Sequence, residues 1–130
     1  MSAFAEYHSV GWAKAYPLPA GVPTRTAAAA LTQGATALTF ITEAYNVQAG
    51  DVVLVHTVAG SVGLAFTQLV KARGGTVIGT TSTPEKAAVA RAHGADHVIL
   101  YPIENTADRV LQITNGEGVH VIFDGVGKDT

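Results

Sequence analysis

The chain has 130 residues and a formal net charge of -2, with 48% hydrophobic and 14% charged residues. This length and apolar content predict one folded domain and exclude a disordered segment. The small net charge and the lack of a basic run argue against nucleic acid and anionic membranes as partners, and the absence of cysteine excludes disulfides, thiolate-bound zinc and a cysteine nucleophile.

The N-terminal part predicts a lead-in segment followed by helices. The stretch from Met1 to Glu6 lacks the basic run and apolar core of a secretory signal, and no apolar run is long enough to span a bilayer, so we expect a cytoplasmic protein. Residues 1 to about 23 end in a proline-rich stretch that is typical of a linker. The alanine-rich residues 24–45 then predict two helices, with a cap at Thr24 or Thr26 and a break at Gln33-Gly34.

From Asp51 onward, after a turn at Gly50-Asp51, short apolar runs alternate with helical patterns. The runs are rich in β-branched residues, which is typical of strands covered on both faces, and they fall at 52–55, 76–79, 97–100 and 119–123. Three stretches between them have helical spacing and end at glycine or asparagine-glycine, at about 62–73, 83–93 and 106–114. The alternation predicts an α/β fold with a doubly wound, Rossmann-like parallel sheet in the strand order 3-2-1-4. Because that fold usually has about six strands, we expect truncation after the fourth, which leaves a bare apolar edge open to pairing.

The bend after the first strand is the first candidate site. Gly60 would let the backbone approach a pyrophosphate at the N-terminus of the next helix, and Gly63 would let that helix pack tightly. Val58 stands where the G-x-G-x-x-G fingerprint has its first glycine. The alternative is an ordinary tight turn that needs small residues.

The end of the second strand indicates which nicotinamide cofactor is preferred. An NAD site usually has an acid there, about 20 residues after the glycines, to hold the ribose 2′-hydroxyl. This chain has none before Glu85, which belongs to the next helix. Ser82 can donate a hydrogen bond, and Lys86 places a cation in the first helical turn, where an anion such as a 2′-phosphate would compensate for the helix dipole. These residues predict NADPH; an ordinary solvated lysine at position 86 is the alternative.

Two further candidates follow the third and fourth strands. Tyr101 lies where it can line an adenosine pocket, although it can also be a half-buried aromatic residue at a strand end. In the stretch 124–127, Gly125 and Val126 would bring the backbone close to the cofactor, unless the stretch is a simple turn. The five histidines lack the spacing of metal ligands, so we expect structural roles for them and no metal site: His8, His56, His93, His97 and His120.

These stretches together resemble a known family. The residues 51–56, 59–63, Gly79-Thr80 with Lys86, and 123–127 are similar to the zinc-free, zeta-crystallin-like quinone oxidoreductases of the medium-chain dehydrogenase/reductase superfamily. The upstream stretches 4–7 and 30–37 are similar to that family too. Ser61 is a departure, since the family often has glycine there. The resemblance covers nearly the whole chain.

The resemblance implies an NADPH-dependent oxidoreductase that reduces quinones or related α,β-unsaturated carbonyls. It implies that Gly60, Ser61, Val62 and Gly63 touch the pyrophosphate, that Ser82, Lys86 and Tyr101 surround the adenosine phosphate, and that Thr36 lies near the nicotinamide. It also implies a lead-in at 1–46 from a separate catalytic domain, an incomplete dinucleotide-binding domain at 47–130, and a homodimer. The alternatives are another zinc-free reductase of enoyl or alkenal substrates, or a binding module without catalysis. We expect the 130 residues alone to be inactive.

Overall fold

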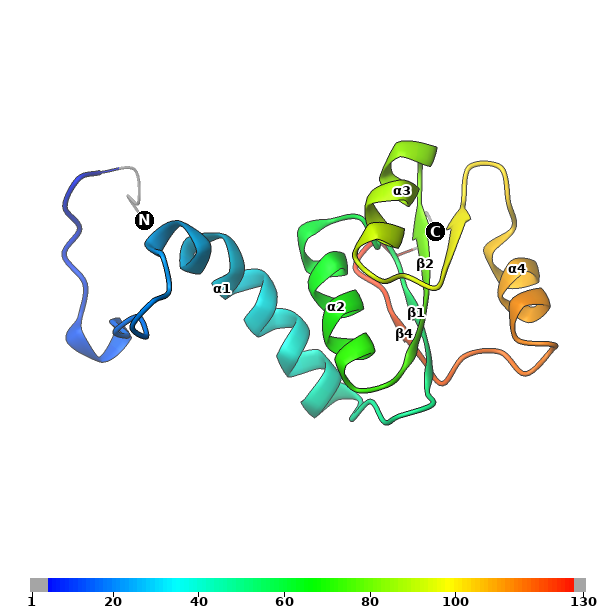
Figure 1. Ribbon diagram of the computed structural model, residues 1–130, viewed down its shortest axis with the longest axis horizontal. Helices are drawn as coiled ribbons and strands as arrows, with labels where there is room; N and C mark the ends of the chain where they lie inside the picture. Colours follow the sequence, from blue (N-terminus) through cyan, green and yellow to red (C-terminus); the bar gives the residue numbers. More distant parts are fainter. Residues whose placement is uncertain (1–4, 128–130) are drawn as a thin grey trace.

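A computed structural model describes residues 5–127 of the chain (Figure 1). Phe4, part of the stretch 4–7 in the family resemblance, lies outside the described residues, as do residues 128–130 of the predicted dinucleotide-binding domain. Figure 1 shows two parts: a sheet flanked by helices, and a long helix that leads from the N-terminal segment to this layered part.

One sheet of four parallel strands organises the described residues. Its strand order is β3-β2-β1-β4, which confirms the sequence prediction and the Rossmann-like α/β class. The strands follow the apolar runs, because such runs are stable only where both faces of a sheet are covered. Their bounds are β1 Val52–Val55, β2 Thr76–Thr81, β3 His97–Leu100 and β4 Val121–Phe123.

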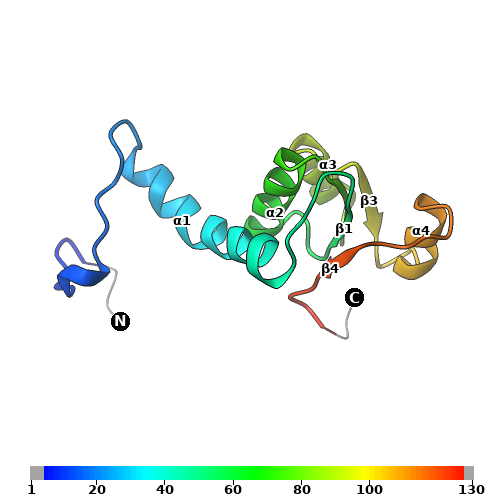
Figure 2. The same ribbon diagram turned by 90° about the horizontal axis from the view of Figure 1, so that it is seen from below.

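Helices cover the two faces of this sheet. The helices α2 (Ser61–Ala72) and α3 (Pro84–Ala92) lie on one face, and α4 (Thr106–Ile113) lies on the other, as Figures 1 and 2 show together. Two hydrophobic clusters result, because successive strand residues point to opposite faces. One joins alternate strand residues such as Val53 and Val77 to Val70 of α2, and the other joins Leu54, Ile78 and Ile99 to Val110 of α4.

The alanine-rich stretch forms one continuous helix, α1 (Thr24–Thr39), and the predicted break at Gln33-Gly34 is wrong. Glycine costs a helix only about 1 kcal/mol relative to alanine. The following turns are fully buried at Ala37 and Ile41, and this packing outweighs that cost.

The predicted threonine cap of α1 is also wrong. The helix begins directly at Thr24, after an extended Pro23 that supplies no side-chain hydrogen bond. The Ala27 amide donates to the Pro23 carbonyl at 3.0 Å, so the first turn closes through the backbone instead. A π-helix, η2 (Phe40–Ala44), continues α1 and turns the chain toward β1.

Strand β4 is shorter than predicted, because Val119 and His120 precede it. The His120 Nδ1 accepts a hydrogen bond from the Val52 amide at 2.9 Å, so its side chain folds back on the start of β1. His120 therefore lies outside the strand in which the sequence placed it. Strand β2, in contrast, extends two residues beyond the predicted end, to Thr81.

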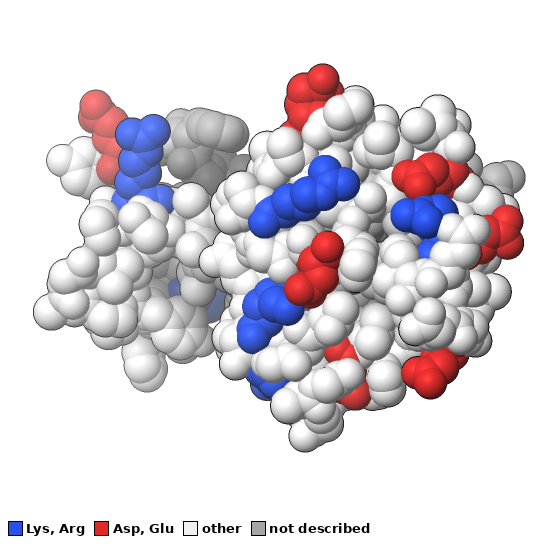
Figure 3. Space-filling model, turned by 45° about the vertical axis from the view of Figure 1, so that its right-hand side comes forward, with Lys and Arg blue, Asp and Glu red and all other residues white. Residues whose placement is uncertain are grey.

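The helix starts predicted from capping residues are confirmed for α3. The Thr83 side chain accepts from the Lys86 amide, and Pro84 occupies the first helical position. Charged side chains of both signs lie scattered over the face drawn in Figure 3, without a large patch of one sign. Among the described residues, no helix is long and apolar enough to cross a membrane.

Candidate functional site

The bend between β1 and α2 presents backbone amides at the carboxyl edge of the sheet. Gly60 has an extended backbone at the N-cap of α2 and makes no side-chain cap hydrogen bond. The first bond across the helix start runs from the Leu64 amide to the Gly60 carbonyl at 2.8 Å. The amides of the first turn therefore lack a side-chain cap and carry the positive end of the helix dipole, which suits an anion.

Gly63 is required by the close contact between α2 and the bend. A Cβ at this position would lie 2.5 Å from the Thr57 carbonyl oxygen and 2.7 Å from that of Val58. Gly60 has more room, since its Cβ would lie 3.2 Å from the Thr57 oxygen. The expected tight packing at Gly63 is thus a feature of the structure, and the contact at Gly60 is less close.

Four predicted site residues meet in one small pocket of about 180 Å³. They come from three segments at the carboxyl edge: Gly60 from the bend, Ser82 and Lys86 from the β2–α3 connection, and Tyr101 from the end of β3. The Lys86 Nζ donates to the Ser82 Oγ at 3.2 Å. The rest of the lining is Thr57, Ala59 and Thr81, so no carboxylate lines the small pocket.

The acid nearest to Lys86 in the sequence, Glu85, does not line the small pocket. Glu85 lies in the first turn of α3, where a hydrogen bond with the Thr83 side chain and a backbone hydrogen bond lower the pKa of its carboxyl. The charge at the small pocket is therefore the Lys86 ammonium, among the hydroxyl-bearing residues Thr57, Thr81, Ser82 and Tyr101. Such a set can bind a phosphate monoester.

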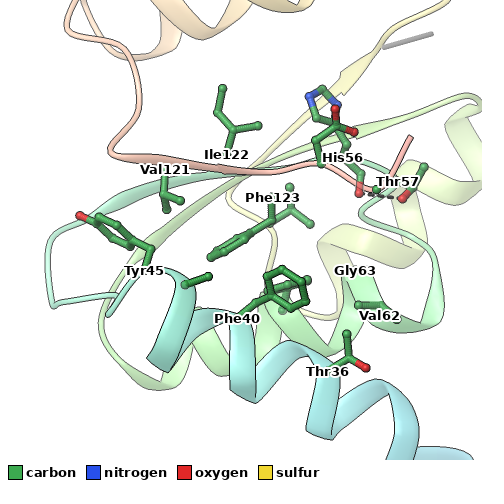
Figure 4. A pocket seen from close by; sticks show the side chains of 15 residues that line it. Thr36, Phe40, Tyr45, His56, Thr57, Val62, Gly63, Val121, Ile122 and Phe123 are labelled. Atoms are coloured by element: carbon green, nitrogen blue, oxygen red, sulfur yellow. Dashed lines mark hydrogen bonds between the residues drawn. The ribbon is translucent and has the colours of Figure 1, made fainter. Parts of the chain in front are cut away.

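A second, large pocket of about 590 Å³ brings together Thr36, Val62, Gly63 and Gly125. Figure 4 shows Thr36 on α1 below it, Val62 and Gly63 on α2, and the β4 side chains above. Its wall contains three phenylalanines: Phe66 and Phe123 stack at 4.5 Å between ring centroids, and Phe40 meets both edge-on. The large pocket is thus mostly apolar, with polar groups at one end.

The polar end contains His56 and Asp124. Burial lowers the pKa of the His56 imidazole, and the Asp124 carboxylate opposes that shift, so the ring is neutral at pH 7. Hydrogen bonds from the Val126 amide, at 2.8 Å, and the Gly127 amide, at 3.0 Å, lower the pKa of Asp124. The Asp124 carboxylate is consequently ionised and orders the turn after β4.

Two predicted site residues line neither pocket. Ser61 is exposed at the first position of α2, and Val126 is exposed in the turn after β4 with its amide directed to Asp124. The large pocket also contains residues that were not predicted from the sequence as site residues, namely Phe40, Tyr45, His56, Phe66 and Phe123. A phenylalanine at the end of an apolar strand was the available signal for Phe123, whereas the π-helix that places Phe40 and Tyr45 has no sequence signature.

A zinc centre does not fit the described residues. Among residues 5–127, no group of three or more histidine, cysteine, aspartate or glutamate side chains could hold a metal ion. The sequence contains no cysteine.

Comparison with known proteins places these features in a family. Residues 61–130 match the family model described as zinc-binding dehydrogenase. A quinone oxidoreductase of Pseudomonas aeruginosa is 42% identical over all 130 residues, which span 40% of its length. The structure of Escherichia coli quinone oxidoreductase complexed with NADPH superposes with a TM-score of 0.84, at 39% identity, over 87% of this chain and 35% of that one. A 2-haloacrylate reductase of a Burkholderia species is 43% identical over 98 residues, 75% of this chain and 29% of the relative.

The described relatives are therefore longer proteins, of which this chain spans about 40% or less. The family match covers more than half of the chain and includes α2, the small pocket residues Ser82, Lys86 and Tyr101, and the turn after β4. The parallel sheet, the glycine-containing bend and this match together show that the chain belongs to the zinc-binding dehydrogenase family and is similar to its quinone oxidoreductases.

Proposed function

We propose that this chain binds NADPH and forms the cofactor-binding part of an enzyme that reduces quinones. The small pocket carries the proposal, because it combines a lysine, four hydroxyl-bearing residues and no carboxylate beside a helix N-terminus without a side-chain cap. The similarity to a quinone oxidoreductase complexed with NADPH supports the same cofactor and substrate class.

In this proposal the cofactor lies across the carboxyl edge of the sheet. The 2′-phosphate accepts hydrogen bonds from Lys86 and Ser82, Tyr101 lines the adenosine side, and the bend 60–63 receives the diphosphate, with Ser61 and Val62 contributing amides. Thr36 and Gly125 flank the nicotinamide end at the large pocket, and Val126, outside the lining of that pocket, contributes through the backbone of the turn after β4. Bound NADPH supplies a hydride, and the residues of this chain bind and orient the dinucleotide.

A reductase of another α,β-unsaturated substrate is the second candidate. It is favoured by the similarity to 2-haloacrylate reductase, which is 43% identical over 98 residues, compared with 42% over 130 residues for the Pseudomonas aeruginosa quinone oxidoreductase. Turnover with NADPH, compared between a quinone and a 2-haloacrylate on the longer parent protein, separates the two. The 130 residues alone are proposed to be inactive, with residues 1–46 as a lead-in and 47–130 as the dinucleotide-binding domain. The homodimer, the cytoplasmic location and the absence of nucleic-acid and membrane partners stay predictions.

Titration calorimetry with NADPH and NADH tests the cofactor. We expect NADPH to bind more tightly, and Lys86→Glu to weaken NADPH by about tenfold or more, because a charge-assisted hydrogen bond to phosphate contributes about 1.5–3 kcal/mol. NADH should change little. Lys14→Glu is the matched control, since it makes the same charge change on the exposed segment before α1. Absence of binding by the wild-type chain would overturn the function, and an unchanged NADPH-to-NADH ratio in Lys86→Glu would remove Lys86 from the site.

A further inference from the structure

His56 belongs to a row of three polar residues that crosses the carboxyl edge of the sheet. His56 follows β1, Thr80 is the second-to-last residue of β2, and Asp124 follows β4. Each comes directly after a residue of the paired set Val55, Gly79 and Phe123. The His56 Nδ1 lies 2.9 Å from the Thr80 Oγ1. Thr80 is fully buried and His56 is 9% exposed, so this pair is shielded from water.

The same two residues hold the bend that begins immediately after His56. The Val58 amide donates to the Thr80 carbonyl at 3.0 Å, and the Thr57 hydroxyl donates to the His56 carbonyl at 2.7 Å. Thr57 has a φ of +51°, in the left-handed region that threonine rarely adopts. A strained residue of this kind persists only where its surroundings fix it, and here the fixed points are His56 and Thr80.

A plain core role for His56 would leave two features unexplained. His56 is a buried imidazole directly after the apolar strand β1, and its hydrogen bond is to the buried side chain of Thr80 rather than to a backbone group. Its ring also lines the large pocket, next to Asp124 and Thr57, as Figure 4 shows for His56 and Thr57. His56 therefore joins the two pockets: it lies in the wall of one and is bonded to the strand that leads to the other.

We propose that His56 is a positioning residue for the bend, and that its hydrogen bond to Thr80 sets the orientation of the amides that receive the diphosphate. The proposal rests on the NADPH function proposed above. His56 acts through the backbone of residues 57–60 and needs no contact with the phosphate groups. Its loss should therefore weaken ligands that contain the diphosphate, and spare ligands that use only the small pocket.

Two ligands separate these effects. NADPH contains the diphosphate, whereas 2′-AMP carries adenine, ribose and the 2′-phosphate without it. We measure both dissociation constants by titration calorimetry for the full wild-type chain, His56→Leu, His56→Asn, Thr80→Val and Thr80→Ser, and compare thermal unfolding of each. Asparagine can place an amide near the position of Nδ1, and serine keeps the hydroxyl, so these are the matched conservative variants.

We expect His56→Leu and Thr80→Val each to weaken NADPH by about tenfold, with 2′-AMP changed less than about twofold. His56→Asn and Thr80→Ser should recover most of the loss, and the double variant His56→Leu/Thr80→Val should lose no more than either single one, because both remove the same hydrogen bond. Equal weakening of both ligands, or additive losses, would overturn the positioning role while leaving the proposed function intact. A wild-type chain that binds 2′-AMP and NADPH equally would overturn the positioning role alone, because the diphosphate would then add nothing, and a wild-type chain that binds neither ligand would overturn both proposals.

Discussion

The side chain of Val58 fills the space in which Gly79 would carry a side chain. A Cβ on Gly79 would lie 2.5 Å from the Val58 Cβ and 2.6 Å from its Cγ2, and Val58 is fully buried. The fingerprint of dinucleotide-binding bends has glycine at the place of Val58. In this chain Val58 on the bend carries the side chain, and Gly79 on the neighbouring strand β2 leaves room for it. The two residues therefore form one packing unit.

This unit predicts that Gly79→Ala is destabilising. The added methyl group would collide with a branched side chain that has no open space to move into, and such overpacking costs about 1–3 kcal/mol. Urea unfolding of the chain measures the loss. Gly34→Ala is the matched control, because open space surrounds Gly34 inside α1 and alanine should stabilise that helix by about 0.5–1 kcal/mol.

Compensation gives the sharper test of the same unit. Val58→Gly alone should lower the free energy of unfolding, because it leaves a cavity. The double variant Val58→Gly/Gly79→Ala should lose less free energy of unfolding than the sum of the two single losses. Strictly additive losses would contradict the direct contact between these two positions.

Gly60 and Gly63 should respond differently to the same substitution. In Gly63→Ala the methyl group would press on two carbonyl oxygens of the bend, so we expect a loss of about 1–3 kcal/mol in unfolding free energy. In Gly60→Ala the backbone angles suit alanine and the methyl group would contact one carbonyl oxygen at 3.2 Å, so the loss of stability should be smaller than in Gly63→Ala, while the substituted residue lines the small pocket. NADPH affinity of the folded variant should fall about tenfold. Unaltered NADPH affinity in Gly60→Ala would show that the ligand does not approach the bend.

Asp96 links α2 to β2 through two different interactions. Its carboxylate contacts Lys71 Nζ at 2.9 Å and accepts from the Val77 amide at 2.7 Å. Partial burial acts to raise the pKa of Asp96, but the hydrogen bonds of Lys71 and Val77 outweigh it and lower that pKa. The stability that this carboxylate contributes is therefore present above its ordinary pKa and is lost as pH falls through the lowered value.

Substitution of the two partners should separate these interactions. Lys71→Met removes a half-exposed ion pair and should cost less than about 1 kcal/mol. Asp96→Ala also leaves the Val77 amide without its acceptor, and should cost about 1–3 kcal/mol at pH 7. Chemical denaturation at pH 7 and near pH 3 measures both, and the difference between wild type and Asp96→Ala should shrink at the acidic pH. A larger loss of unfolding free energy in Lys71→Met than in Asp96→Ala would contradict the larger contribution expected from the hydrogen bond of the Val77 amide.

The strands and their order could be predicted because the signal is local. Continuous β-branched runs and glycine stops repeat at regular spacing, and the rule of right-handed crossovers converts that repeat into an order. The break at Gly34 and the inclusion of His120 in β4 were wrong for a common reason. Each depends on a partner far away in sequence: the core that buries Ala37 and Ile41, and the Val52 amide that binds His120.

The small pocket was also accessible from the sequence, since Ser82 and Lys86 are neighbours in the chain and Gly60 and Tyr101 each follow a strand. The large pocket was not. Its phenylalanines come from a π-helix, from α2 and from β4, and only the packed fold brings their rings together. His56 was assigned a structural role because the five histidines lack the spacing of metal ligands. Its bond to Thr80 spans 24 residues and leaves no pattern in the sequence.

The buried His56 should give the unfolding free energy a distinct pH dependence. Burial lowers its pKa in the folded chain below the ordinary value of 6.5, against the opposing charge of Asp124. Around and below pH 6.5 the unfolded chain therefore binds more protons than the folded one, so stability should fall as pH decreases through 6.5 and the lowered pKa, and the slope from His56 should fade within about one pH unit above 6.5. Asp124, whose own pKa is lowered from 3.8, acts only in a more acidic range. Urea unfolding of wild type and His56→Asn between about pH 5 and 8 measures the difference in unfolding free energy. This difference should grow with pH and level off above about pH 7.5. His8→Asn, which removes an exposed imidazole, is the control, and parallel curves for wild type and His56→Asn would show that the buried ring does not titrate in this range.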